Sequence, residues 1–306
     1  MTFELLANVP LPLEHVTQWI LYWRGARRFI TGDTKKAFAI DPANPSTPAA
    51  LPGSNRTADS ACNLPIASAT CDEVLAGSWR GFSFLKCAEY AHNTGGDLLR
   101  TIIFGPNYGL HMRHPASGLV LALKSASIDL LTETNGAFAQ CDKTKTRGKA
   151  ALCFAAHPNE TLLAYGDNYG AFHLHLFDAT GFAKASKLAE KERKASAVEF
   201  AQHGERIIIG GMGYLSAFSY CDGKTRMLHE TSTSVRDFVL IGDGERIVVN
   251  QGLHGIALYS FRDHGFEKLS DATPAGPVNQ IAVSDDGKLV AITRQDRSDV
   301  SVFAVG

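Results

Sequence analysis

The sequence predicts an all-β protein, a seven-bladed β-propeller with four-stranded antiparallel blades in which the N-terminal strand completes the last blade. Three observations predict this fold. The 306 residues are 45% hydrophobic and 20% charged, with 28 glycines and 12 prolines, as in an ordinary globular chain. Short alternating segments recur in the order strand, acidic or glycine turn, strand, hairpin, strand. The recurring unit is about 44 residues long, which is the length of one four-stranded blade.

The repeat is clearest in the C-terminal half. In the last unit, an apolar segment over 278–283 leads through an Asp-Asp-Gly turn to strands over 289–293 and 299–305. The two preceding units show the same order over 235–261 and 197–220, and each continues into a fourth alternating piece. Earlier copies are fainter. The chain is therefore expected to form one domain over 1–306, with blades at 10-59, 60-106, 107-149, 150-194, 195-234, 235-276 and 277-306 plus 1-9.

Both ends of the chain fit a closed ring. The last unit stops at Gly306 after three strands, and an extra alternating segment over 3–9 precedes the first unit. The N-terminal segment can therefore supply the missing outer strand, which leaves no long free sheet edge. Residues 184–194 have a helix-forming composition, but their place in the repeat predicts an outer strand or a loop.

The order of turns and strands resembles that of the WD-repeat family of seven-bladed propellers over essentially the whole chain, and Ser284-Asp-Asp-Gly287 is nearest to the family's inner-strand turn. No unit carries the family's Gly-His start or its Trp-Asp end; Ser260-Phe261, Ser219-Tyr220 and Phe177-Asp178 take the places of Trp-Asp. The resemblance implies a divergent member that acts as a platform for other macromolecules. The fold itself hosts many activities.

Composition excludes several classes of protein. Thirty Lys and Arg residues against 31 Asp and Glu residues leave a net charge of −1, which excludes a global attraction to nucleic acid or anionic lipid. The N-terminus has no signal-peptide pattern and no window approaches 18 uninterrupted apolar residues, so a cytoplasmic location without membrane contact is expected. Six cysteines without a CxxC pair predict reduced, mostly buried thiols.

Polar side chains are expected along the channel, because the innermost strand of each blade faces it. The candidate channel residues are Gln18, Asn63, His111, Glu199, Asp237 and Gln280. The favoured interpretation is that they hydrogen-bond channel water. The alternative is a cation held by Asp237 and Glu199, with His111 moving protons, as in propellers that hydrolyse lactones. Because only two of these residues are carboxylates, we predict no metal and no cofactor.

Histidines and short motifs do not point to catalysis. His173 and His175 share one strand face, but a structural role is favoured over a metal pair. His114-Pro and His157-Pro occupy equivalent turns in consecutive units, where hydrogen bonding to local backbone is expected. The sequence contains no Gly-x-Ser-x-Gly, P-loop or His-Glu-x-x-His motif. No catalytic residue is predicted.

Large side chains at the predicted second-to-third-strand hairpins favour a protein or peptide partner, because Trp, Tyr and Arg are enriched in binding hot spots. The candidate contact residues are Trp79, Arg80, Tyr169, Tyr214, Leu253, His254 and Arg294.

Loops before two inner strands add cations that are expected on the same face. This basic patch comprises Lys143, Lys145, Arg147, Lys149, Lys191, Arg193 and Lys194. Glu190 and Glu192 are interleaved with it, so a solvated rim is favoured over a site for an acidic partner or an RNA backbone. The predicted function is a non-catalytic adaptor. The alternatives are a metal-dependent propeller hydrolase or lactonase and a non-catalytic subunit of an RNA-modifying or other enzyme complex.

Overall fold

The computed structural model describes most of the chain. The described residues are 2–13, 19–23, 26–32, 36–50, 65–69, 74–78, 86–92, 98–106, 111–114, 117–124, 127–134, 137–145, 151–191, 193–262 and 265–306.

The chain divides into two compact units. Unit 1 comprises Met1–Asn107, Gly252–Leu258 and Leu269–Gly306, and unit 2 comprises Tyr108–Gln251 and Tyr259–Lys268. The described residues form seven antiparallel sheets, a number compatible with the seven predicted blades. The extent of the predicted single domain stays a prediction.

Three sheets lie wholly in unit 1. The first comprises β2 (Trp19–Trp23), β3 (Arg28–Gly32), β4 (Ala37–Ile40) and β5 (Ala49–Ala50), in that order. The second comprises β6 (Pro65–Ala69), β7 (Val74–Ser78), β8 (Lys86–His92) and β9 (Leu98–Pro106), in that order. The third has the order β1-β29-β28-β27, with bounds β1 (Phe3–Pro10), β27 (Val278–Val283), β28 (Leu289–Arg294) and β29 (Asp299–Val305).

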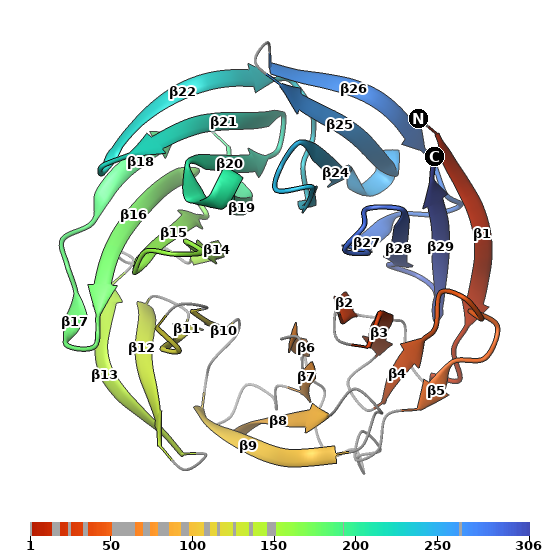
Figure 1. Ribbon diagram of the computed structural model, residues 1–306, viewed down its shortest axis with the longest axis horizontal. Helices are drawn as coiled ribbons and strands as arrows, with labels where there is room; N and C mark the ends of the chain where they lie inside the picture. The colour runs from red at the N-terminus through yellow and green to blue at the C-terminus, as the bar shows by residue number, and fades with distance from the viewer. Residues whose placement is uncertain are drawn as a thin grey trace. The chain divides into compact units, whose positions relative to one another are not determined.

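The predicted completion of the last sheet by the N-terminal strand is confirmed. β1 runs antiparallel to β29, with Phe3 opposite Val305 and Pro10 opposite Asp299. Figure 1 shows β1 in red beside β29 in dark blue, with the two chain ends adjacent. Backbone hydrogen bonds of 3.0 Å join Thr2 and Gly306 in both directions. The alternating segment that precedes the first repeat is therefore the fourth strand of the last one.

Three sheets lie wholly in unit 2. The first comprises β10 (His111–Arg113), β11 (Val120–Lys124), β12 (Ser127–Thr134) and β13 (Ala137–Lys145). The second comprises β14 (Ala151–Ala156), β15 (Leu162–Asp167), β16 (Ala171–Asp178), β17 (Gly181–Phe182) and β18 (Ser186–Glu190). The third comprises β19 (Ala195–Ala201), β20 (Arg206–Gly211), β21 (Tyr214–Cys221) and β22 (Lys224–Thr231).

The seventh sheet has strands in both units. It has the order β23 (Asp237–Ile241), β24 (Arg246–Asn250), β25 (Ile256–Arg262) and β26 (Gly265–Ala272). Two short 3₁₀ turns complete the described elements, η1 (Gln202–Gly204) and η2 (Gly252–His254). No helix of the described residues is both long enough and apolar enough to cross a membrane.

The lysine-rich segment forms the outer strand predicted for it. β18 pairs with β16, with Lys187 opposite His173, and only Leu188 of its five residues is buried. The helix-forming composition of this segment is overridden by its pairing, since tertiary context outweighs propensity.

Middle strands are apolar on both faces because neighbouring sheets cover both sides. All of β15 is buried, as is β20 apart from its first residue, whereas the outer strand β22 has no buried residue. In unit 2 one apolar cluster joins the sheets β14–β18 and β19–β22, with Phe172, Leu174, Ile207 and Ile209 at its centre. Packing between sheets therefore supplies the core.

The prediction of mostly buried cysteines is wrong for two of the three cysteines whose side chains are described. Cys153 is buried in the apolar cluster, but Cys141 and Cys221 are exposed. Cys141 lies on the outer strand β13 and Cys221 ends β21, so both stand at the periphery of their sheets.

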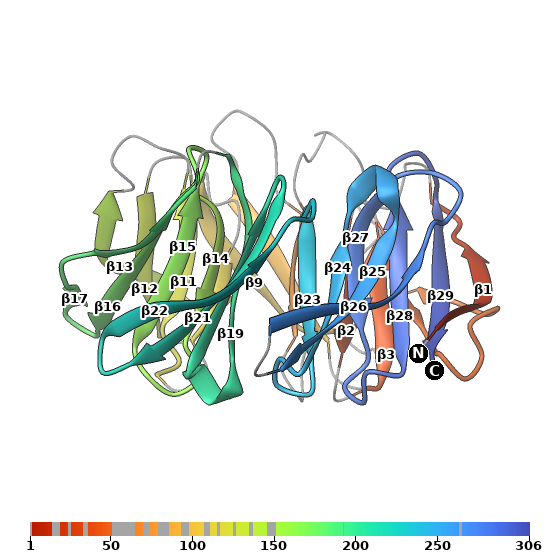
Figure 2. The ribbon, with the colours of Figure 1, turned by 90° about the horizontal axis from the view of Figure 1, so that it is seen from above.

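Connections between the strands of unit 2 gather at two opposite edges of its sheets, as the side view in Figure 2 shows. One edge carries the hairpins between second and third strands, at 168–170 and 212–213. We call it the hairpin face. The opposite edge carries the turns between first and second strands, and we call it the turn face.

Candidate functional site

A buried carboxylate shapes the hairpin at 168–170. Asp167 ends β15, and its Oδ1 accepts hydrogen bonds from the backbone N–H groups of Tyr169 at 2.8 Å and Ala171 at 3.0 Å. Gly170 has φ +89°, a conformation that glycine adopts without strain. This turn places Tyr169 at the tip, with 62% of its surface exposed.

Lys191 and Arg193, in the loop between β18 and β19, pack directly against this hairpin. The Lys191 N–H donates to the Gly170 carbonyl at 2.9 Å. A Cβ at position 170 would lie 2.4 Å from the carbonyl oxygens of both Lys191 and Arg193, so only glycine fits between them. Lys191 forms an ion pair with Glu230, and its ammonium lies 5.5 Å from the centre of the Tyr214 ring.

The hairpin at 212–213 lies on the other side of the same loop. Met212 is 56% exposed at its tip. A Cβ at Gly213 would be 3.0 Å from Nη1 of Arg193, and the Tyr214 hydroxyl donates to the Arg193 carbonyl at 3.5 Å. Two hairpins and one loop thus form a continuous surface of unit 2. We call its exposed side chains the hairpin-face patch: Tyr169, Met212, Arg193 and Lys194.

Two predicted contact residues are buried. Tyr214 is 6% exposed and packs edge-on against Phe172. Arg294 is 4% exposed; it donates to Oδ1 of Asp299 at 3.2 Å and to the Ala275 carbonyl at 2.9 Å. These contacts are structural, so neither side chain offers surface to a partner in this conformation.

The other predicted contact residues are exposed or lie outside the described part. Leu253, which is 76% exposed, and His254, which is also exposed, belong to η2 in unit 1. Trp79 and Arg80 lie outside the described residues.

Some residues of the predicted basic patch are exposed, some are covered, and others lie outside the described part. Arg193 and Lys194 are exposed, whereas Lys191 is mostly covered by its contacts with Glu230 and Tyr214. Lys143 is exposed on β13. Lys145 is on the same strand, opposite Ser127, but its side chain lies outside the described part, as do Arg147 and Lys149.

Two predicted channel carboxylates lie close together on first strands of unit 2. Glu199 is on β19 and Asp237 begins β23. Desolvation by the surrounding protein raises the pKa of the Glu199 carboxyl to about 8, and repulsion by the charge of Asp237 adds to this effect. Burial also raises the pKa of Asp237 to about 6, against a hydrogen bond from the Phe238 N–H at 2.8 Å. No group of three or more His, Cys, Asp or Glu side chains in the described part could hold a metal ion.

The remaining channel predictions have fewer described contacts. In unit 1 the Gln280 side-chain oxygen accepts a hydrogen bond of 3.1 Å from the Ile20 N–H, and so joins β27 to β2. His111 is on β10, but its side chain lies outside the described part. Gln18 and Asn63 lie outside the described residues.

We expect Glu199→Gln to stabilise the protein at high pH. The pKa of Glu199 is raised in the folded protein. The contribution of this carboxyl to the free energy of unfolding is therefore fully present below its ordinary pKa and is lost as the pH rises through about 8. The variant should be more stable than wild type by about 1 kcal/mol at pH 9, a modest effect because this side chain also contacts solvent. Urea unfolding of wild type, Glu199→Gln and the exposed control Glu205→Gln at pH 4, 6.5 and 9 measures this effect. A gain at pH 4 as large as at pH 9 contradicts it.

On the turn face, the predicted bonding of two histidines to local backbone is confirmed. His114 is fully buried, and its Nδ1 accepts a hydrogen bond of 3.0 Å from the Ser117 N–H. In the next sheet, Nδ1 of His157 accepts from the N–H groups of Asn159 at 3.2 Å and Glu160 at 2.9 Å.

Both rings also reach the turn of the following sheet, which the sequence analysis did not anticipate. Nε2 of His114 lies 3.1 Å from the His157 carbonyl and 2.9 Å from the Glu160 carbonyl. Because Nδ1 accepts, Nε2 carries the proton and donates. His157 in turn hydrogen-bonds to the backbone of Gly204, while burial lowers its pKa. The signal was the His-Pro pair in equivalent turns of two consecutive units.

The His173 and His175 pair has the structural role predicted for it. His175 is buried, stacks on Tyr165 and has Nδ1 3.2 Å from the Ala183 carbonyl. Nε2 of His173 lies 3.8 Å from Oδ2 of Asp167.

Comparison with solved structures identifies the fold. The β-propeller domain of Cps50 (Swd1) from Myceliophteria thermophila superposes with a TM-score of 0.76 at 11% identity, over 99% of this chain and 100% of that one. The chain has the β-propeller fold. A propeller chain from a crystal structure of the mitotic checkpoint complex is similar as well, with a TM-score of 0.75 at 13% identity, over 98% of this chain and 94% of that one. No family model and no curated protein sequence matches this propeller.

The comparisons support, at the level of fold, the resemblance to WD-repeat propellers.

Proposed function

We propose that this propeller is a cytoplasmic, non-catalytic interaction scaffold that binds a protein or peptide on the hairpin face of unit 2. The observation that carries the proposal is the hairpin-face patch. Its exposed aromatic ring and flexible thioether, Tyr169 and Met212, flank a loop that presents Arg193 and Lys194. Aromatic, methionine and arginine side chains are the types enriched in protein interfaces.

Rigid placement of the patch favours binding. The Asp167 carboxylate fixes the backbone around Tyr169, and the Gly170 carbonyl holds Lys191. A surface that is ordered before binding loses less conformational entropy when a partner docks. The two exposed cations favour a partner with acidic side chains.

Further contact residues are proposed outside unit 2. Leu253 and His254 form an exposed pair on η2 of unit 1. We also propose Trp79 and Arg80 as contact residues, as expected from the sequence. The mitotic checkpoint structure shows that a chain of this fold can belong to a protein complex, which supports a scaffold role in general.

The test compares a variant of the patch with a control variant that removes an exposed apolar side chain elsewhere in unit 2. The patch variant is Tyr169→Ala/Met212→Ala, and the control is Leu176→Ala, an exposed residue of β16. Tagged wild type and both variants are used to purify partners from the native cells. The affinity of each stoichiometric partner is then measured with purified components.

We expect the patch variant to weaken binding at least thirtyfold, since truncating hot-spot residues costs about 2 kcal/mol or more. The control should bind like wild type. Equal affinity of wild type and patch variant for every stoichiometric partner would overturn the hairpin-face proposal.

A further inference from the structure

A bulge in the outer strand of the third sheet of unit 2 gathers basic side chains on one face. Arg206 and Arg226 both lie opposite Ser219 in the antiparallel pairing of β20, β21 and β22, so their side chains share a face. The side chains of the next cross-strand pair, Phe218 and Met227, point to the opposite face of the sheet. Beyond it the register shifts, because Leu228 is an extra residue between the pairs made by Met227 and His229. A bulge of this kind re-aims the side chains that follow it.

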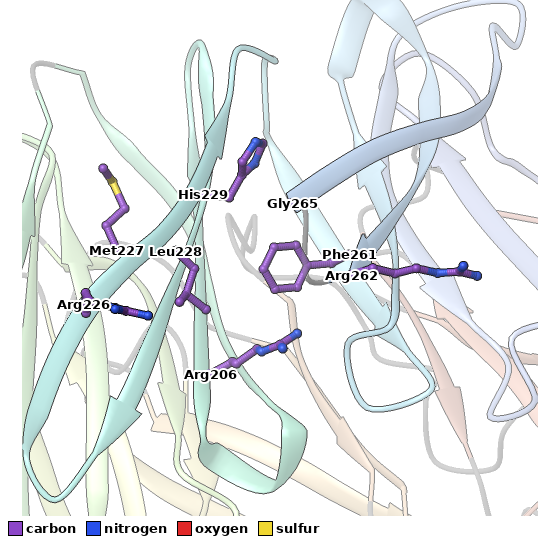
Figure 3. A pocket seen from close by; sticks show the side chains of 8 residues that line it. All are labelled: Arg206, Arg226, Met227, Leu228, His229, Phe261, Arg262 and Gly265. Atoms are coloured by element: carbon purple, nitrogen blue, oxygen red, sulfur yellow. The ribbon is translucent and has the colours of Figure 1, made fainter.

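The bulge creates a pocket beside the first residues of β26. Its volume is about 400 Å³, and its lining comprises Arg206, Arg226, Met227, Leu228, His229, Phe261, Arg262 and Gly265, all in unit 2. Figure 3 shows Leu228 and Phe261 pointing toward each other, with His229 on one side and Arg206 on the other. In the same view Met227 points away from them and Arg262 extends outward. The inner wall is therefore apolar and its rim is basic.

Two groups at the rim are positioned to donate hydrogen bonds. The Arg206 guanidinium carbon lies 4.8 Å from the centre of the Phe261 ring, which holds this cation by a cation–π contact. The Phe266 N–H donates to Nδ1 of His229 at 3.2 Å. The neutral ring therefore carries its proton on Nε2, where it can donate to a ligand.

The pocket has no negative charge among its described lining residues. Three arginines are among the residues that line it, and no described carboxylate forms an ion pair with Arg206, Arg226 or Arg262. Arg226 and Arg262 are both exposed. Such a group of like charges is complementary to a multiply charged anion, and arginine clusters recognise phosphoryl groups through several N–H···O contacts.

The position of the pocket favours a ligand carried on an extended chain. Among the described strands β22 is the last of its sheet, so one of its edges has no described strand paired with it. An extended peptide can lie along such an edge while one side chain enters a pocket. The volume fits one or two side chains, at the lower end of the range for ligand pockets.

We propose that this pocket binds a phosphorylated side chain of an extended peptide. Arg206 and Arg226 contact the phosphoryl oxygens, Nε2–H of His229 donates to the same group, and Leu228 and Phe261 pack against a neighbouring apolar side chain of the peptide. This site is separate from the hairpin-face patch and does not depend on it.

The test uses the full-length protein on a solid support and degenerate peptide pools of the form Gly-X-X-Z-X-X-Gly. Z is phosphoserine, aspartate or serine. We expect wild type to retain the phosphoserine pool at least tenfold more than the serine pool at 50 mM NaCl. Arg226→Gln and Arg206→Gln should each reduce that retention at least fivefold.

Lys224→Gln is the matched control, because it removes one exposed cation from the same strand outside the pocket lining. It should retain the phosphoserine pool like wild type, and so should Tyr169→Ala/Met212→Ala, which separates this site from the proposed hairpin face. Equal retention of phosphoserine and serine pools overturns the proposal. So does equal loss in Lys224→Gln, or retention of the aspartate pool as strong as that of the phosphoserine pool. Inorganic phosphate and an oligonucleotide are each tested as competitors. If either one displaces the phosphopeptides at the concentration at which free phosphopeptide does so, the requirement for a peptide is overturned.

Discussion

Gly204→Ala is expected to destabilise the propeller by about 3–5 kcal/mol, combining backbone strain with overpacking. Gly204 ends η1 on the turn face with φ +103°, a conformation that L side chains rarely adopt. A Cβ at this position would lie 1.8 Å from Nε2 of His157. That ring is buried between Phe200 and Tyr220, at centroid distances of 5.0 and 5.8 Å, so it has no room to retreat.

A matched glycine separates strain from collision. Gly118 also has positive φ, +70°, but a Cβ there would meet nothing within 4 Å. Gly118→Ala should therefore show the cost of strain alone, about 1 kcal/mol. Urea unfolding of wild type and both variants measures the difference. A Gly204→Ala variant that unfolds at the same urea concentration as Gly118→Ala would show that the His157 ring can move aside.

Strand order was predictable from the sequence because each unit repeats the same sequence of turns. The place of the N-terminal segment as the fourth strand of the last sheet, seen in the pairing of β1 with β29, follows from a count of strands, because the last unit has only three. The outer strand at Ser186–Glu190 follows from its place in the repeat, despite a composition that favours helix. Such predictions use the whole chain, so an error in one segment is corrected by the others.

Surface exposure was less predictable, because it depends on contacts between segments far apart in sequence. Tyr214 and Tyr169 both belong to hairpins of the same face, yet one is buried and the other is exposed. The difference lies in the loop between β18 and β19, whose Lys191 ammonium and Arg193 carbonyl contact Tyr214. Nothing in the residues around Tyr214 indicates that this loop will cover it.

The basic pocket was missed for a related reason. The sequence predicts a fourth strand around Arg226, but strict alternation along a strand would place Leu228 and His229 on opposite faces. A bulge changes that, and the signal for it was two consecutive apolar residues, Met227 and Leu228, on a strand whose other positions are polar. Phe261, which completes the pocket, comes from the next sheet. Local patterns do not indicate which side chains of different sheets will meet.

His114→Ala is expected to cost about 3–5 kcal/mol, because the ring is buried and joins two turns. Its loss removes the acceptor of the Ser117 N–H and leaves a cavity edge-on to Phe177. It also removes the His114 donor from the His157 carbonyl, and the Glu160 carbonyl keeps only the hydrogen bond of 2.7 Å from the Leu162 N–H. The control is His203→Ala, on the same face, whose ring is 88% exposed and lies 3.5 Å from Oδ2 of Asp243. That variant should change stability by less than about 0.5 kcal/mol.

The two histidine variants also test whether the turn face is linked from sheet to sheet. If His114 holds the turn at His157 in place, hydrogen exchange at the Asn159 and Glu160 amides should accelerate in His114→Ala, because those N–H groups bond to the His157 ring. Amides of the more distant Asp167 hairpin should keep their protection. His203→Ala should leave both sets unchanged. Equal stability of the two variants, or unchanged exchange at Asn159 and Glu160 in His114→Ala, would mean that each turn is stable on its own and that the contact between sheets adds nothing.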